Sequence, residues 1–78
     1  MSWNYRVMKK RINGEDVFEI HEVYYHPDGR IHAWSEDPVI PYGETPEELK
    51  QDILMQSGAL ERPVLDYDTL VTEHDDPR

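Results

Sequence analysis

The residues with the clearest potential for chemistry gather around Glu22. The strand pairing derived below places Tyr5, Tyr24, His32 and Trp34 on the same side of a sheet as this carboxylate. Neighbouring rings disfavour the charged form of a carboxyl group and raise its pKa, which suits a general acid or base. The same neighbours could instead satisfy Glu22 by hydrogen bonding, without any reaction. These five residues are therefore a candidate small-molecule or minor enzymatic site, with a purely structural role as the alternative.

Other possible catalytic or metal-binding motifs lack the spacing or the number of ligands that such sites require. His21 and His26 are spaced one residue too far apart for a zinc-protease motif, and in a strand they point to opposite faces. Glu19 with His21 supplies only two ligands, and residues 74–76 fit a solvated tail. The sequence holds no nucleophile elbow, P-loop or dinucleotide fingerprint. We therefore predict no catalytic residues, no metal and no cofactor, and do not expect an enzyme.

Two turn motifs define the elements that must position the candidate site. Asn13-Gly14 favours a two-residue hairpin, because both residue types tolerate positive φ. The run 26–29, His-Pro-Asp-Gly, favours a type I turn closed by the glycine. Residues 3–12, 17–26 and 30–35 are rich in β-branched and aromatic side chains and read as three strands. The sequence therefore predicts a three-stranded antiparallel meander.

Strand pairing then assigns each side chain to one of two faces. The turns pair Tyr5 and Trp34 with Glu22, and Val23 with Ala33, provided that no bulge intervenes. Face one is the more aromatic set: Trp3, Tyr5, Val7, Phe18, Ile20, Glu22, Tyr24, His32 and Trp34. Face two is the more mixed set: Asn4, Arg6, Met8, Val17, Glu19, His21, Val23, Tyr25, Ile31, Ala33 and Ser35. We expect the single helix to cover face one.

The helix has the strongest local signal in the chain. Thr45 is a good N-cap, Pro46 suits the first helical position, and Glu48 completes a capping box. Pro63 sets the outer limit of a helix that runs from Pro46 to about Glu61. The sequence therefore predicts an α+β fold, in which the β-meander is packed on one face by a single C-terminal α-helix. This domain spans residues 1–65, and an acidic, largely disordered tail follows over residues 66–78.

Composition restricts the classes of partner. The chain has 78 residues, no cysteine and a net charge of −9. Residues 1–30 carry five basic and five acidic side chains, whereas residues 31–78 carry three and twelve, so the acidic excess lies in the second part. This charge disfavours nucleic acid, and no apolar run is long enough to cross a membrane. Residues 1–11 lack the apolar region of a signal peptide, so we expect a cytoplasmic protein.

Face two offers a candidate interface. One helix covers only one side of a sheet, so a contiguous apolar group remains on the other side, consisting of Met8, Val23, Tyr25, Ile31 and Ala33. A small core without disulfides gains stability by association, which favours a homodimer or binding to another protein. The alternative is that residues 64–71 fold back over face two. The predicted function is a non-enzymatic protein-interaction module.

The pattern of residues also resembles known groups of proteins. Residues 3–6 (Trp-Asn-Tyr-Arg), residues 21–25 (His-Glu-Val-Tyr-Tyr), Asp28-Gly29 and Ala33-Trp34 together resemble a group of small bacterial proteins of unknown function, over most of residues 3–65. That resemblance implies no activity. Three strands followed by residues 43–49, Gly-Glu-Thr-Pro-Glu-Glu-Leu, are also similar to HicB-like antitoxin domains, although residues 39–43 depart from the Pro-Gly motif of that family. This similarity implies an antitoxin role as a further alternative.

Overall fold

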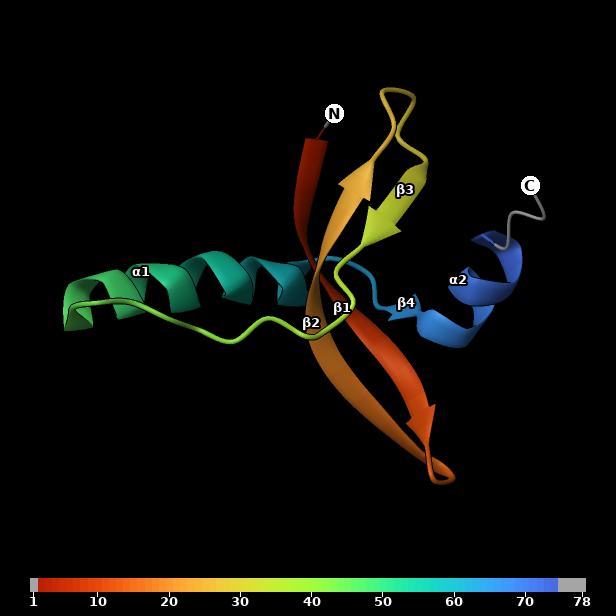
Figure 1. Ribbon diagram of the computed structural model, residues 1–78, viewed down its shortest axis with the longest axis horizontal. Helices are drawn as coiled ribbons and strands as arrows, with labels where there is room; N and C mark the ends of the chain where they lie inside the picture. The colour runs from red at the N-terminus through yellow and green to blue at the C-terminus, as the bar shows by residue number, and fades with distance from the viewer. Residues whose placement is uncertain (1, 75–78) are drawn as a thin grey trace.

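The computed structural model describes residues 2–74 and has an α+β fold (Figure 1). Its elements are, in order, β1 (Ser2–Ile12), β2 (Glu15–Tyr25), β3 (Ile31–Trp34), α1 (Pro46–Ser57), a 3₁₀ turn η1 (Gly58–Glu61), β4 (Leu65–Asp66) and α2 (Tyr67–His74). The four strands form one sheet in the order β3-β2-β1-β4. The sheet is mixed, because β4 runs parallel to β1 while the other pairs are antiparallel. The predicted α+β class and meander are confirmed, and β4 and α2 are additional.

The first hairpin follows the sequence prediction. Asn13 has a φ of 52° and Gly14 a φ of 80°, as a two-residue turn of this kind requires. The turn pairs Ile12 with Glu15, and the same register brings Tyr5 opposite Glu22. The pairing of the two long strands, β1 and β2, therefore fixes the relative positions of Tyr5 and Glu22 in the candidate site.

The second hairpin begins as predicted and then changes register. The Gly29 amide donates to the His26 carbonyl at 2.9 Å, and Gly29 has a φ of 92°. Tyr25 pairs with Ile31 as expected, but Tyr24 pairs with Ala33 and Val23 with Trp34. The predicted pairing beyond Ile31 is therefore wrong by one residue, because a β-bulge inserts an extra residue into β3. A one-residue shift moves every later side chain of β3 to the opposite face.

Helix α1 begins where the sequence predicts. The Thr45 hydroxyl accepts a hydrogen bond from the Glu48 amide at 3.1 Å, and Pro46 occupies the first turn. The Glu48 carboxylate accepts from the Glu44 amide at 3.0 Å, which satisfies a second donor at this end. α1 and η1 together span the predicted helix. The predicted packing of this helix over face one is wrong, because α1 extends away from the sheet and only its C-terminal end and η1 reach β1 (Figure 1).

The cap makes a direct prediction about stability. Thr45→Ala removes the side-chain acceptor of the Glu48 amide and should lower the free energy of unfolding by about 1 kcal/mol. Urea denaturation followed by far-ultraviolet circular dichroism measures this loss. Thr69→Ala on the exposed side of α2 is the matched control and should change the midpoint far less. Equal midpoints for wild type and Thr45→Ala would show that this cap does not stabilise the helix.

The C-terminal segment forms β4 and α2 up to His74, where the sequence predicts an acidic, largely disordered tail from residue 66. Leu65 pairs with Met8 in the sheet, and Asp66 accepts hydrogen bonds from the amides of Asp68 and Thr69 at the start of α2. The first residue of α2, Tyr67, packs edge-on against Trp34, with ring centroids 6.2 Å apart. The final residues of the expected tail, 75–78, lie outside the described part of the chain.

The interior of the protein is small. Among the described residues, the buried apolar side chains are Val7, Met8, Val23 and Ala59. His21 and Gln56 are buried with them, so polar groups occupy part of the core. Many large apolar side chains remain exposed instead, several of them on α1 and on the loop before it. The fold therefore leaves more apolar surface in water than a chain with a complete core would.

Candidate functional site

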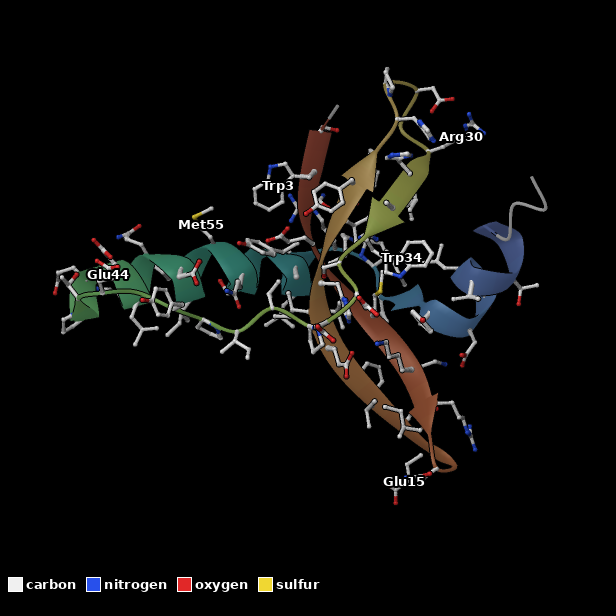
Figure 2. The ribbon with its side chains drawn as sticks, in the orientation of Figure 1. Trp3, Glu15, Arg30, Trp34, Glu44 and Met55 are labelled. Carbon is white, nitrogen blue, oxygen red and sulfur yellow. The ribbon has the colours of Figure 1, made fainter. Side chains whose placement is uncertain are left out.

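Strands β1 and β2 position four side chains as a block on face one. Trp3 lies opposite Tyr24, and Tyr5 lies opposite Glu22. The Tyr24 hydroxyl donates a hydrogen bond to Glu22 Oε1. The Trp3 and Tyr5 rings meet edge to face, with centroids 5.2 Å apart, and Trp3 is labelled in Figure 2 near the start of β1. The pleat and the cross-strand pairs thus place three rings beside one carboxylate.

A second carboxylate, Asp52 of α1, lies near enough for its negative charge to act on Tyr5 of this block. Asp52 Oδ2 accepts hydrogen bonds from the Tyr42 amide at 2.8 Å and from Gln56 Nε2 at 3.1 Å. Burial raises the pKa of the Tyr5 hydroxyl, and the negative charges of Asp52 and Glu22 raise it further. We call the five residues Trp3, Tyr5, Glu22, Tyr24 and Asp52 the aromatic–acidic corner.

The structure brings together only part of the predicted site. Tyr5, Glu22 and Tyr24 lie together as expected. His32 is exposed, and its ring centroid lies 4.6 Å from that of His26 in the second hairpin. Trp34 pairs with Val23, so the bulge carries it to face two, where it packs against Tyr67. The placement of His32 and Trp34 in the candidate site is therefore wrong.

Two members of the corner were missed as site residues in the sequence analysis. Trp3 lies two residues before Tyr5 in the same strand, so the alternation of side chains could have included it. Asp52 had no such signal, because its contribution depends on where α1 meets the sheet. No family model matches the chain, and comparisons with curated proteins and with solved structures also give no match.

The chemistry of the corner is that of charge and hydrogen bonding. The hydrogen bond to Glu22 raises the pKa of Tyr24, so both tyrosines keep their protons at neutral pH and act as donors. Within residues 2–74, no group of three histidine, aspartate or glutamate side chains is placed to hold a metal ion. None of the helices in this range is long and apolar enough to cross a membrane. The corner is thus an open, negatively charged group of rings.

The residues predicted to form an exposed interface on face two are instead buried, half-buried or hydrogen-bonded within the chain. Met8 and Val23 are fully buried by their own chain. Tyr25 is held by hydrogen bonds: its hydroxyl accepts from Arg6 Nη1 at 3.0 Å and donates to Asn4 Oδ1 at 2.7 Å. Ile31 and Ala33 are half-buried, and Ala33 has moved with the bulge to pair with Tyr24. These five residues therefore do not form a contiguous exposed patch.

Part of face two is covered by residues that follow α1, as in the alternative considered for residues 64–71. Arg6 Nη2 donates to the Pro63 carbonyl oxygen at 2.8 Å. Lys10 Nζ lies 4.6 Å from the centroid of the Tyr67 ring, which also packs against Trp34. The segment that leaves η1 is therefore tied to side chains of β1 and β3.

His21 is the polar centre of face two. Its ring is fully buried, with Nδ1 2.9 Å from the Ser35 carbonyl oxygen and Nε2 2.9 Å from Glu19 Oε1. Serine, histidine and glutamate together have the composition of a hydrolase triad. Here, however, the Ser35 hydroxyl donates to the Asp37 carbonyl oxygen at 2.9 Å, so its proton is not directed at His21. The geometry is that of a structural network, which Lys10 extends by an ion pair with Glu19 at 3.1 Å.

This network predicts a dependence of stability on pH. The hydrogen bond from His21 lowers the pKa of Glu19 from its ordinary value of 4.5. A carboxyl group whose pKa is lower in the folded state stabilises the fold above its unfolded pKa, and this contribution is lost as pH falls through the folded pKa. Wild type should therefore lose stability as the pH falls below about 4.5. Urea midpoints measured against pH should fall less steeply there for Glu19→Gln, whereas the exposed control Glu36→Gln should retain the wild-type slope.

Proposed function

We propose that the chain is a protein-interaction module that associates with a second copy of itself through α1. The observation that carries this proposal is the exposure of large apolar side chains on α1 and on the loop before it. We call this set the α1 surface: Ile40 (79 % exposed), Tyr42 (69 %), Leu49 (38 %), Ile53 (47 %), Leu54 (54 %) and Met55 (56 %). A helix that projects from a small domain with these side chains in water is typical of an interaction element.

Part of the α1 surface lies on one side of the helix. At 3.6 residues per turn, Leu49, Ile53 and Leu54 lie within about 140° of one another around α1, whereas Met55 points away from them. A two-fold axis through α1 would apply the same surface twice, so one helix per chain suffices. The small core gives the chain a thermodynamic reason to associate, because few other apolar side chains are available to stabilise it.

Light scattering across low to high micromolar concentrations tests this proposal. We expect wild type to become dimeric within this range, and Ile53→Glu and Leu54→Glu to remain monomeric, because each buries a charge in the interface. Thr69→Glu adds the same charge to the exposed side of α2 and should still dimerise. A wild type that is monomeric throughout, or glutamate variants that dimerise as wild type does, would contradict the proposal.

The alternatives from the sequence have unequal support. A small-molecule site around Glu22 is favoured by the aromatic–acidic corner, although without His32 and Trp34. The antitoxin role rests only on the resemblance of the strands and of residues 43–49, and it stays a prediction, as does a cytoplasmic location. The acidic excess continues to disfavour nucleic acid as a partner.

A further inference from the structure

We propose that the aromatic–acidic corner binds an organic cation that carries a guanidinium or alkylammonium group. Three aromatic rings and the Glu22 carboxylate lie together on β1 and β2, and the negative charge of Asp52 on α1 acts on the Tyr5 hydroxyl of the same group. Trp3 is 47 % exposed and the other four residues are half-buried, so the group is open to a ligand. The faces of aromatic rings attract cations, and adjacent carboxylates add full negative charges to that attraction.

The negative charge of the corner is not neutralised by the described part of the chain. The ion pairs among the described residues join other side chains: Lys9–Asp66, Lys10–Glu19, Arg11–Asp16, His21–Glu19 and Arg30–Asp28. None of them involves Glu22 or Asp52. Each carboxylate is held by neutral donors instead, Glu22 by the Tyr24 hydroxyl and Asp52 by the Tyr42 amide and the Gln56 amide group. The donors orient these carboxylates without cancelling their charge, which leaves a site for an external cation.

The chemistry of the corner favours an organic cation over a metal ion. Divalent metals in proteins prefer shells of several oxygen ligands, and the corner offers two carboxylates among rings. A guanidinium group is planar and weakly hydrated, so it can stack on a ring while its N–H groups donate to carboxylates. Alkylated ammonium groups are likewise attracted to ring faces. Such a group belongs either to a free small molecule or to the side chain of another protein.

Nuclear magnetic resonance of the full chain tests the proposal with defined probes. Guanidinium chloride at non-denaturing concentrations, tetramethylammonium chloride and N-acetyl-arginine amide are titrated at constant ionic strength, with sodium chloride as the reference salt. We expect a saturable shift of the Trp3 indole N–H resonance with the organic cations and none with sodium. Two aromatic residues are internal controls: Trp34 on face two, and Phe18, which pairs with Lys9 on face one. Their resonances should not show this saturable shift. Tighter binding of arginine-containing peptides than of N-acetyl-arginine amide would identify a protein side chain as the source, and equal binding would identify a free cation.

Substitutions of the carboxylates complete the test. Glu22→Gln and Asp52→Asn keep an oxygen that accepts the observed hydrogen bonds, so the local structure should persist. Each should weaken binding at least about fivefold, and the double variant should abolish saturation. Glu15→Gln, at the start of β2, is the matched control and should bind as wild type does. A Trp3 shift that is the same with sodium, or one that survives the double substitution, would overturn the proposal.

Discussion

Replacing Met8 with alanine should lower the free energy of unfolding by about 2–4 kcal/mol. The Met8 side chain is fully buried, and its strand position pairs with both Glu19 and Leu65. The loss combines the transfer of apolar surface into water with the cavity that remains. Because the described core has few apolar members, this single truncation removes a large share of it. Urea denaturation at low micromolar protein concentration measures the change.

Met55→Ala is the matched control, because it makes the same chemical change on α1 at a residue that is 56 % exposed. It should cost less than about 1 kcal/mol in the monomer, as ordinary surface substitutions do. Similar losses for Met8→Ala and Met55→Ala would show that face two is not buried within one chain. That result would favour the homodimer through face two that the sequence predicts.

Gly43→Ala should have the second large effect, because α1 approaches the backbone closely at this position. A Cβ atom at residue 43 would lie against Leu49 N, 2.7 Å from Glu48 C and 2.8 Å from Leu49 Cα. These are backbone atoms of the first turns of α1, so no side-chain rotation can relieve the overlap. We expect a loss of about 2 kcal/mol or more, at the upper end of ordinary point substitutions. Amide chemical shifts should change over residues 42–52.

Gly58→Ala is the matched control for this substitution. Gly58 has helical backbone angles (φ −60°, ψ −22°), and its nearest atom to an added Cβ is Arg62 Nη1 at 3.6 Å. Alanine should therefore be tolerated and should stabilise the chain by roughly 0.5–1 kcal/mol through its higher helix propensity. If Gly43→Ala were as stable as Gly58→Ala, the close contact between the loop and α1 would be wrong.

Local signals account for the parts of the fold that the sequence predicts. Asn13 and Gly14 fix the register of β1 and β2, because positive φ at both positions permits a two-residue turn. Thr45 and Pro46 fix the start of α1, because the cap bond forms within one turn of the chain. Each of these features depends on residues a few positions apart, so composition and spacing suffice to predict it.

The features that the sequence does not predict depend on distant residues. The bulge in β3 shifts Trp34 to face two, where it meets Tyr67, a residue far along the chain. The orientation of α1 depends on how the loop at Gly43 meets the helix. β4 and α2 form in a polar segment, through pairing of Leu65 with Met8 and capping by Asp66. Tertiary contacts outweigh the local composition that favours disorder here.

Local signals likewise predict only part of the candidate site. Tyr5, Glu22 and Tyr24 follow from strand alternation and from the first turn, so the sequence brings them together correctly. His32 and Trp34 lie beyond the bulge, so the same reasoning misplaces them. Asp52 joins the corner only through the placement of α1, which no local pattern specifies.

Amide hydrogen exchange along α1, measured against protein concentration, tests the central claim that α1 is the surface of association. In the monomer, α1 makes few contacts with the sheet, so its amides should exchange quickly. We expect exchange over residues 49–57 to slow as the concentration rises from low to high micromolar. Exchange in the middle of β1 and β2 should remain unchanged, because these strands are already paired. Rates over residues 49–57 that are independent of concentration would contradict the claim.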